Sequence, residues 1–213
     1  MKFVRGITYC LLLVVFSSAM PSEKATRKFT TWYSENASSL MLSEIEDYYT
    51  CTIRYIPTEL NVLRAVSSET EVKRSEIKEL YEKYEGSYEF TFKVRKKNVS
   101  DLLTHVSDGQ EDYTNRQFYL LESIGQDFTL VTKQGELKPL DCHFENNYGA
   151  APFLTFHLVF DRAEDNELQH FIYQDQFFGL GSLIYDLNTI ENLTIPKIKS
   201  VSYTHLRAHE TAS

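Results

Sequence analysis

The sequence predicts a mainly β fold with two short helices: an antiparallel β-sandwich, immunoglobulin-like in its C-terminal part. From Ser87 onward, short stretches carry aromatic and β-branched side chains at every second position. Turn residues such as Asp108-Gly109 and Gln134-Gly135 separate these stretches. Short strands without intervening helices are typical of antiparallel sheets that pack face to face.

Residues 20–44 are predicted to form a linker or a short helix. Phe29, Trp32 and Tyr33 are spaced to share one side of a helix, among polar and charged neighbours. A single β-rich domain then follows over residues 45–200, a length that suits one hydrophobic core.

The first strand of this domain is predicted over residues 45–56, where side chains alternate between two faces. Pro57 ends the strand, and Thr58 can cap a short helix. A second helix is predicted between Ser68, which begins a capping box, and Gly86.

The remainder of the domain is predicted to consist of strands. The first stretch alternates strictly, with Tyr88, Phe90, Phe92 and Val94 on one face, and turn residues separate the stretches that follow. The strands are expected at residues 88–94, 117–123, 127–132, 137–145, 153–160, 171–174 and 183–187.

Residues 1–19 have the pattern of a signal peptide. Two basic residues precede an apolar run over residues 7–16, about half the length of a membrane-spanning helix, and Ala19 offers a cleavage site. We therefore expect a secreted or periplasmic protein with no transmembrane segment in the mature chain. Lipid anchoring stays open, because Cys10 lies within the apolar run rather than after it.

Residues 201–213 resemble a translated sequencing-library adapter. We expect this segment to be a non-native tail, with a short polar C-terminus as the alternative. We therefore do not consider His205 and His209 as metal ligands or catalytic residues.

The charge of the chain indicates which partners are unsuitable. The sequence contains 22 Lys and Arg against 30 Asp and Glu, a net charge of −8. An acidic surface repels phosphate groups, so nucleic acid and anionic membranes are poor partners. The one basic cluster, Arg95-Lys96-Lys97, is predicted to be a solvated loop after a strand.

Cys51 and Cys142 are the disulfide candidates. In an oxidising compartment they could close a loop of about 90 residues. The alternative is two buried free thiols, because cysteine is among the residue types most often buried.

A strand that contains Asp141, His143 and Glu145 would present all three side chains on one face. His157, on the outer face of a nearby strand, could add a fourth ligand. We therefore consider a metal site at His143, Glu145 and His157, or a general base there. The alternative is an ordinary polar outer face, because three positions along one strand spread too far to meet a single ion.

A second candidate site consists of aromatic side chains around one carboxylate. Such a group can bind a small ligand or a glycan, although most aromatic residues in a sandwich belong to its core. The residues are Phe171, Tyr173, Asp175, Phe177 and Phe178.

Parts of the chain resemble uncharacterised exported proteins of Gram-negative bacterial envelopes. The resemblance implies a surface or periplasmic module without an assigned activity. It rests on Tyr55-Ile-Pro57-x-Glu59, a strand pair around Arg116 to Leu130, His143-Phe-Glu145 and Ile195-Pro196-x-Ile198.

The sequence contains no nucleophile elbow, no His-Glu-x-x-His helix and no glycine-rich phosphate loop. We therefore expect a non-catalytic envelope or surface domain with a structural or protein-interaction role, which needs no cofactor and binds an envelope or surface protein. A small-ligand or glycan-binding module is the first alternative. A metal-dependent hydrolase centred on His143 is the second.

Overall fold

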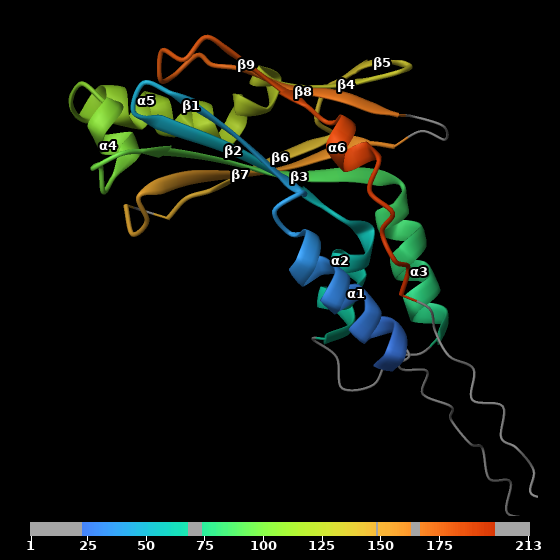
Figure 1. The fold of residues 1–213 in the computed structure, drawn as a ribbon. Helices are drawn as coiled ribbons and strands as arrows, with labels where there is room; N and C mark the ends of the chain where they lie inside the picture. Colours follow the sequence, from blue (N-terminus) through green and yellow to red (C-terminus); the bar gives the residue numbers. More distant parts are fainter. Residues whose placement is uncertain (1–22, 68–73, 148, 163–166, 199–213) are drawn as a thin grey trace, which may run out of the picture.

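The computed structural model describes residues 23–67, 74–147, 149–162 and 167–198 (Figure 1). The predicted signal peptide, the capping box at Ser68 and the C-terminal tail lie outside the described residues. No helix within the described ranges has the length and apolar character needed to cross a bilayer.

Two antiparallel sheets form most of the molecule, as the alternating sequence patterns predict. The five-stranded sheet has the order β1 (Met41–Glu46), β2 (Tyr49–Ile56), β3 (Ser87–Lys96), β7 (Phe153–Asp161), β6 (Asp141–Glu145). The four-stranded sheet has the order β5 (Gly135–Leu137), β4 (Phe128–Thr132), β8 (Leu168–Gln174), β9 (Ser182–Asp186).

The prediction of two helices is wrong, because the described part of the chain contains six. Three of them, together with the C-terminal segment, lie beyond one end of the sheets, whereas α4 and α5 lie at the other end (Figure 1). The helices are α1 (Glu23–Asn36), α2 (Thr58–Ser67), α3 (Arg74–Glu85), α4 (Leu102–Val106), α5 (Gly109–Glu122) and α6 (Asn188–Glu191), and a 3-10 turn spans Ile124–Asp127.

The two sheets pack through their aromatic inner faces in a sandwich-like arrangement. The Phe92 ring on β3 lies 4.7 Å from that of Tyr173 and 5.2 Å from that of Phe128, measured between ring centroids. The hydroxyl of Tyr185 donates a hydrogen bond of 3.1 Å to the carbonyl oxygen of Cys51, from one sheet to the other. Burial of these rings is the main stabilising contribution to the core.

A smaller core joins the helices to the sheet. Phe29 of α1 packs with Ile56, Leu60 and the C-terminal Ile198. The Ile198 amide also donates to the Tyr81 hydroxyl at 2.8 Å. The segment predicted to be a linker or a short helix is therefore helical and anchored, and sheet pairing begins at Met41 rather than at residue 45.

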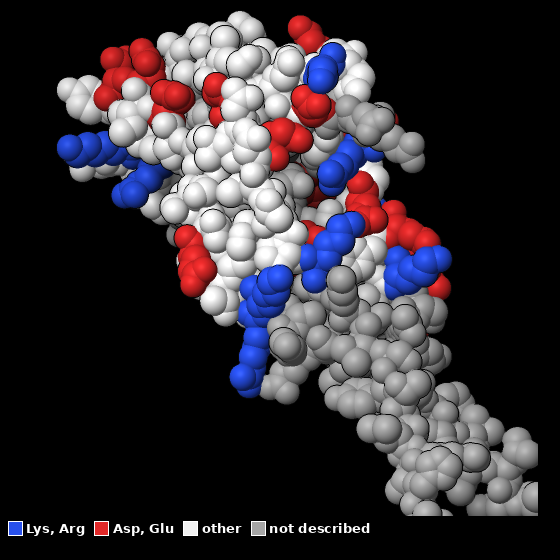
Figure 2. Space-filling model, turned by 45° about the vertical axis from the view of Figure 1, so that its right-hand side comes forward, with Lys and Arg blue, Asp and Glu red and all other residues white. Residues whose placement is uncertain are grey.

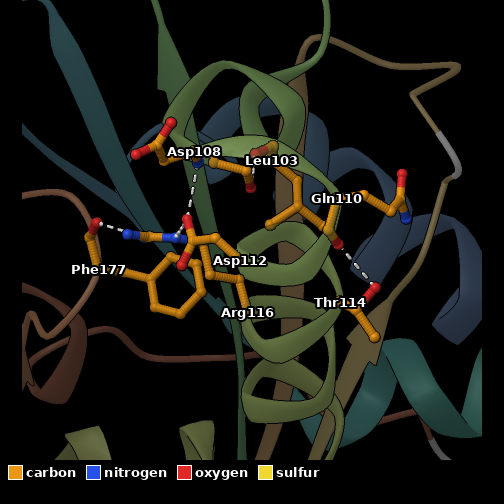
Figure 3. A network of polar contacts seen from close by, with 8 residues as sticks. Leu103, Asp108, Gln110, Asp112, Thr114, Arg116 and Phe177 are labelled. Atoms are coloured by element: carbon orange, nitrogen blue, oxygen red, sulfur yellow. Dashed lines mark hydrogen bonds and ion pairs between the residues drawn. The ribbon is translucent and has the colours of Figure 1, made fainter.

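The strand predicted at residues 117–123 is part of α5, so the strand pair expected around Arg116 to Leu130 is not present. An ion pair one turn apart supports the helix here: Arg116 Nε lies 2.6 Å from the Asp112 carboxylate (Figure 3). Arg116 also donates to the Phe177 carbonyl at 3.2 Å, which ties α5 to the segment after β8. The stretch after Arg116 contains four consecutive aromatic or aliphatic residues, Phe118 to Leu121, and a short apolar run fits both a buried strand and a helix.

Two predicted strands are each divided in the structure. The stretch 45–56 contains a turn at Asp47, whose φ of 52° is left-handed, so that β1 and β2 pair as a hairpin. The stretch 137–145 crosses from β5 in one sheet to β6 in the other. The strand order does not confirm an immunoglobulin-like topology, which stays a prediction.

Candidate functional site

The outward face of the five-stranded sheet contains a cavity of about 510 Å³. Side chains alternate across a strand, so the residues beside the buried aromatic positions of β2, β3 and β7 point away from the core. We call this space the outer-face cavity. It is lined by Met41, Thr50, Thr52, Arg54, Ile56, Arg64, Glu89, Phe90, Thr91, Lys93, Arg95, Glu145, Phe153, Thr155, His157, Leu158 and Val159.

Strand register brings cations and threonines together at the centre of the cavity. On β2 and β3, Thr52 lies opposite Lys93, and Arg54 lies opposite Thr91. Arg54 and Lys93 therefore lie diagonally across the two strands, and Thr52 and Thr91 lie on the other diagonal of the same four residues. In the structure Arg54 Nη2 lies 2.7 Å from Met41 Sδ and Lys93 Nζ lies over the Phe153 ring. Diagonal neighbours in a sheet are within reach of long side chains, so both heads can contact one bound group if they turn from these contacts toward it.

The cavity is more basic than the chain as a whole. Its lining contains four cationic side chains against two carboxylates, in a protein with a net charge of −8. Within the described residues, no carboxylate makes an ion pair with Arg54, Lys93 or Arg95. Elsewhere, on the face seen in Figure 2, acidic and basic side chains form small separate groups. Unpaired cations around a concavity attract anions.

Thr155 adds a buried polar group to this surface. It lies opposite Lys93 on β7, and its side chain is 2% exposed. Its hydroxyl oxygen has no hydrogen-bond partner among the described residues. A buried hydroxyl without a partner is costly, and native proteins rarely leave one unless a bound molecule or water satisfies it.

Apolar side chains lie at both ends of the cavity. Phe153 lies at one end, where the Lys93 ammonium nitrogen is 4.5 Å from the centroid of its ring. Ile56 and Val159 lie toward the other end, where α2 contributes Arg64 to the lining. The cavity therefore combines a basic, hydroxyl-rich centre with apolar flanks, the composition typical of small-molecule sites.

Two of the predicted metal residues, Glu145 and His157, line the cavity, and His143 lies next to them. Register places His143 opposite His157, with 6.3 Å between the ring centroids, and His157 Nε2 is 3.4 Å from Glu145 Oε2. All three side chains are exposed. In the described ranges, no group of three His, Cys, Asp or Glu side chains is arranged to hold a metal ion. The arrangement matches the polar outer face that was the alternative.

The predicted aromatic ligand site lies elsewhere. Phe171 and Tyr173 are fully buried between the sheets, so a ligand cannot reach them. The Asp175 carboxylate accepts the Tyr173 hydroxyl at 2.8 Å and the backbone N–H groups of Phe177, Phe178 and Leu180. These contacts give Asp175 a structural role in shaping the loop between β8 and β9.

The predicted disulfide is not present, because Cys51 and Cys142 are both free. They lie on β2 and β6, with two strands between them, so their separation far exceeds the reach of a disulfide. Burial raises the pKa of each thiol to about 12, assisted by Asp175 near Cys51 and by Asp141 near Cys142. The free-thiol alternative therefore describes the structure.

Sequence reasoning missed the central residues of the cavity: Arg54, Thr91, Lys93 and Thr155. Their polar alternation was visible, but it also fits an ordinary solvated sheet face. The cluster that begins at Arg95 was predicted to be a loop, whereas Arg95 and Lys96 belong to β3 and Arg95 lines the cavity.

Comparison of the chain with protein-family models, with curated proteins and with solved structures finds no match.

Proposed function

We propose that the protein is an exported, non-catalytic binding module whose small-molecule ligand occupies the outer-face cavity. The observation that carries this proposal is the buried, unpartnered hydroxyl of Thr155 in the wall of a 510 Å³ cavity. Ligand pockets of about 300–1,000 Å³ commonly combine apolar walls with a few converging polar groups. Because the hydroxyl oxygen is closed to solvent, the Thr155 side chain would have to turn toward the cavity for a bound polar molecule to satisfy it.

The position of the cavity also supports a binding role. It lies over the central strands β2, β3 and β7, whose other face is fixed by the aromatic core. A site on paired strands is held more rigidly than a site on loops, so little ordering is required when the ligand binds. The proposal rests on this cavity and not on an immunoglobulin-like topology. Export remains a prediction from residues 1–19.

A thermal-shift screen of chemically diverse small molecules tests this function. A ligand at 100 times its Kd stabilises the folded state by about 2.7 kcal/mol, which shifts Tm by several degrees. Thr91→Tyr fills the centre of the cavity and should abolish the shifts. Ile184→Tyr, on an exposed position of the four-stranded sheet, is the matched control and should preserve them. The proposal fails if no compound gives a shift that Thr91→Tyr removes.

A protein-interaction role, the leading expectation from the sequence, is the second candidate. The observation that favours it is a group of exposed apolar side chains at α5 and before β6. Leu121 and Leu140 line one surface depression and are 46% and 70% exposed. A partner protein that binds the Ile184→Asp control but does not bind the Leu140→Asp variant would support this role. Equal retention by both variants would count against it.

We do not propose the metal-dependent hydrolase that was predicted around His143. Its three side chains are exposed, and only Glu145 and His157 are within ion-pair distance of each other. Elemental analysis of the purified protein is the measurement that bears on this prediction.

A further inference from the structure

We infer that the ligand of the outer-face cavity is a small amphipathic organic anion, whose acidic group lies between Arg54 and Lys93 and whose apolar body extends toward Ile56 and Val159. This inference rests on the proposed function and names the chemical class of the ligand. Carboxylates, sulfonates and phosphate monoesters share the required chemistry.

The position of the acidic group follows from the two cations and the two threonines at the centre of the cavity. Arg54 and Lys93 lie diagonally across β2 and β3, and neither has a carboxylate partner within the described ranges. Like charges on neighbouring strands repel each other, and a bound anion between them converts this repulsion into two attractive contacts. Short threonine side chains on the other diagonal leave space for the anion.

Hydroxyl donors complete the anion site. Thr52 and Thr155 lie on either side of Lys93 in the same row of the sheet. The Thr52 hydroxyl already lies 2.9 Å from that of Ser43, whereas the buried Thr155 hydroxyl has no partner among the described residues and can donate once its side chain turns toward the cavity. An anionic oxygen beside Lys93 would accept this donor, which removes the cost of its burial.

The orientation of the ligand follows from the next row of residues. Arg54, Thr91 and His157 lie opposite one another and form one row across the three strands. Two positions further along, the next row consists of Ile56, Glu89 and Val159. The Glu89 carboxylate repels a second acidic group at this end, and the two apolar side chains favour a hydrocarbon body. Adjacent rows on one face are about 7 Å apart, so a ligand with a body of four to six carbon atoms spans the distance.

Matched probes on a 3-phenylpropyl scaffold separate charge from shape. The series comprises 3-phenylpropionate, the corresponding sulfonate and phosphate monoester, the neutral primary amide and the amine. Kd values are measured by amide chemical-shift titration of the full-length mature protein at low and high salt. We expect one or more of the anions to bind at least tenfold more tightly than the amide and the amine, and their affinity to fall with salt. The rank order of the three anions identifies the acidic group.

Variants locate the charge effect. Lys93→Gln and Arg54→Gln should each weaken the best anion by about tenfold to a hundredfold and leave the amide within about twofold. Lys97→Gln, an exposed lysine next to the same strand, is the matched control and should leave all affinities unchanged. Lys93→Glu should reverse the preference in favour of the amine, a gain of binding that misfolding cannot produce.

The outcomes distinguish the two proposals. If the amide or the amine binds in the cavity as tightly as the anions, the inference is overturned while the binding function stands. If no member of the series binds, the inference is overturned, and the thermal-shift screen decides whether the binding function stands. If that screen also gives no hit that Thr91→Tyr removes, both proposals fail.

Discussion

Thr155 lies directly opposite Lys93 in the antiparallel pair of β3 and β7, and its buried hydroxyl has no hydrogen-bond partner among the described residues. A valine would have nearly the same shape at this position without the unpaired hydroxyl. The threonine therefore costs stability in the unliganded protein. This cost is typical of a group whose partner is supplied by a ligand.

Replacement of Thr155 by Val should stabilise the unliganded protein and weaken ligand binding. We expect the free energy of unfolding to rise by about 1 kcal/mol, because a buried hydroxyl without a partner is removed. Urea denaturation measures this change. Thr132→Val is the matched control: Thr132 is equally buried, but its hydroxyl donates to the Gly135 carbonyl at 2.9 Å. That variant should lose about 1 kcal/mol. Destabilisation by both substitutions would contradict this account of Thr155.

The hydrogen bond from Tyr185 to Cys51 should contribute to the packing of the two sheets. Tyr185→Phe keeps the ring in the core but removes the donor to the Cys51 carbonyl. We expect the free energy of unfolding to fall by about 1 kcal/mol. Tyr48→Phe, at a position 69% exposed, should change it by less than about 0.5 kcal/mol. Equal effects of the two substitutions would show that the inter-sheet bond contributes nothing.

Asp127 should make stability depend on pH in the acidic range. Burial raises the pKa of its carboxyl, an effect that the hydrogen bond from Tyr119 partly offsets, and Asp175 raises it further. The folded protein therefore retains a proton that the unfolded chain releases as the pH rises through the ordinary value of 3.8. The contribution of Asp127 to the free energy of unfolding is therefore greatest below that pH, and it is lost as the pH rises through the pKa of Asp127 in the folded protein.

Asp127→Asn removes this titration and can still accept the Tyr119 hydroxyl. We expect the variant to have a higher Tm than the wild type at pH 7, and the difference to vanish below pH 3.8, where both side chains are neutral. Thermal unfolding between about pH 3 and 7 measures this difference. Asp141→Asn, at an exposed position, is the matched control for the loss of one carboxylate. A constant difference at every pH would contradict the assignment.

Cys51 and Cys142 should remain reduced and react slowly in the folded protein. Burial holds both pKa values near 12, so little thiolate is present at neutral pH. We expect iodoacetamide to label both residues only after denaturation, and peptide mass spectrometry to find no linked pair. A linked peptide from unreduced protein would overturn the strand order described here.

The strands at residues 88–94 and 153–160 were predicted correctly, because every side chain on one face of each strand is aromatic or aliphatic. α5 was predicted wrongly, because the apolar run Phe118 to Leu121 fits both a strand and a helix and the ion pair of Asp112 with Arg116 was not considered. The outer-face cavity could not be predicted, since the meeting of Arg54, Lys93 and Thr155 depends on the register of three strands. Phe171 and Tyr173 were predicted as ligand contacts because aromatic composition alone does not separate core from surface.

The central claim is that the outer-face cavity binds a small anionic molecule, and amide chemical-shift mapping with 3-phenylpropionate tests it most directly. A ligand of this size binds with a Kd of about 1 mM, which such a titration measures well. We predict saturable shifts at Thr52, Lys93 and Thr155 that Thr91→Tyr abolishes. Saturable shifts confined to the Asp175 loop, or no saturable shift with 3-phenylpropionate or with the corresponding sulfonate and phosphate monoester, would contradict the claim.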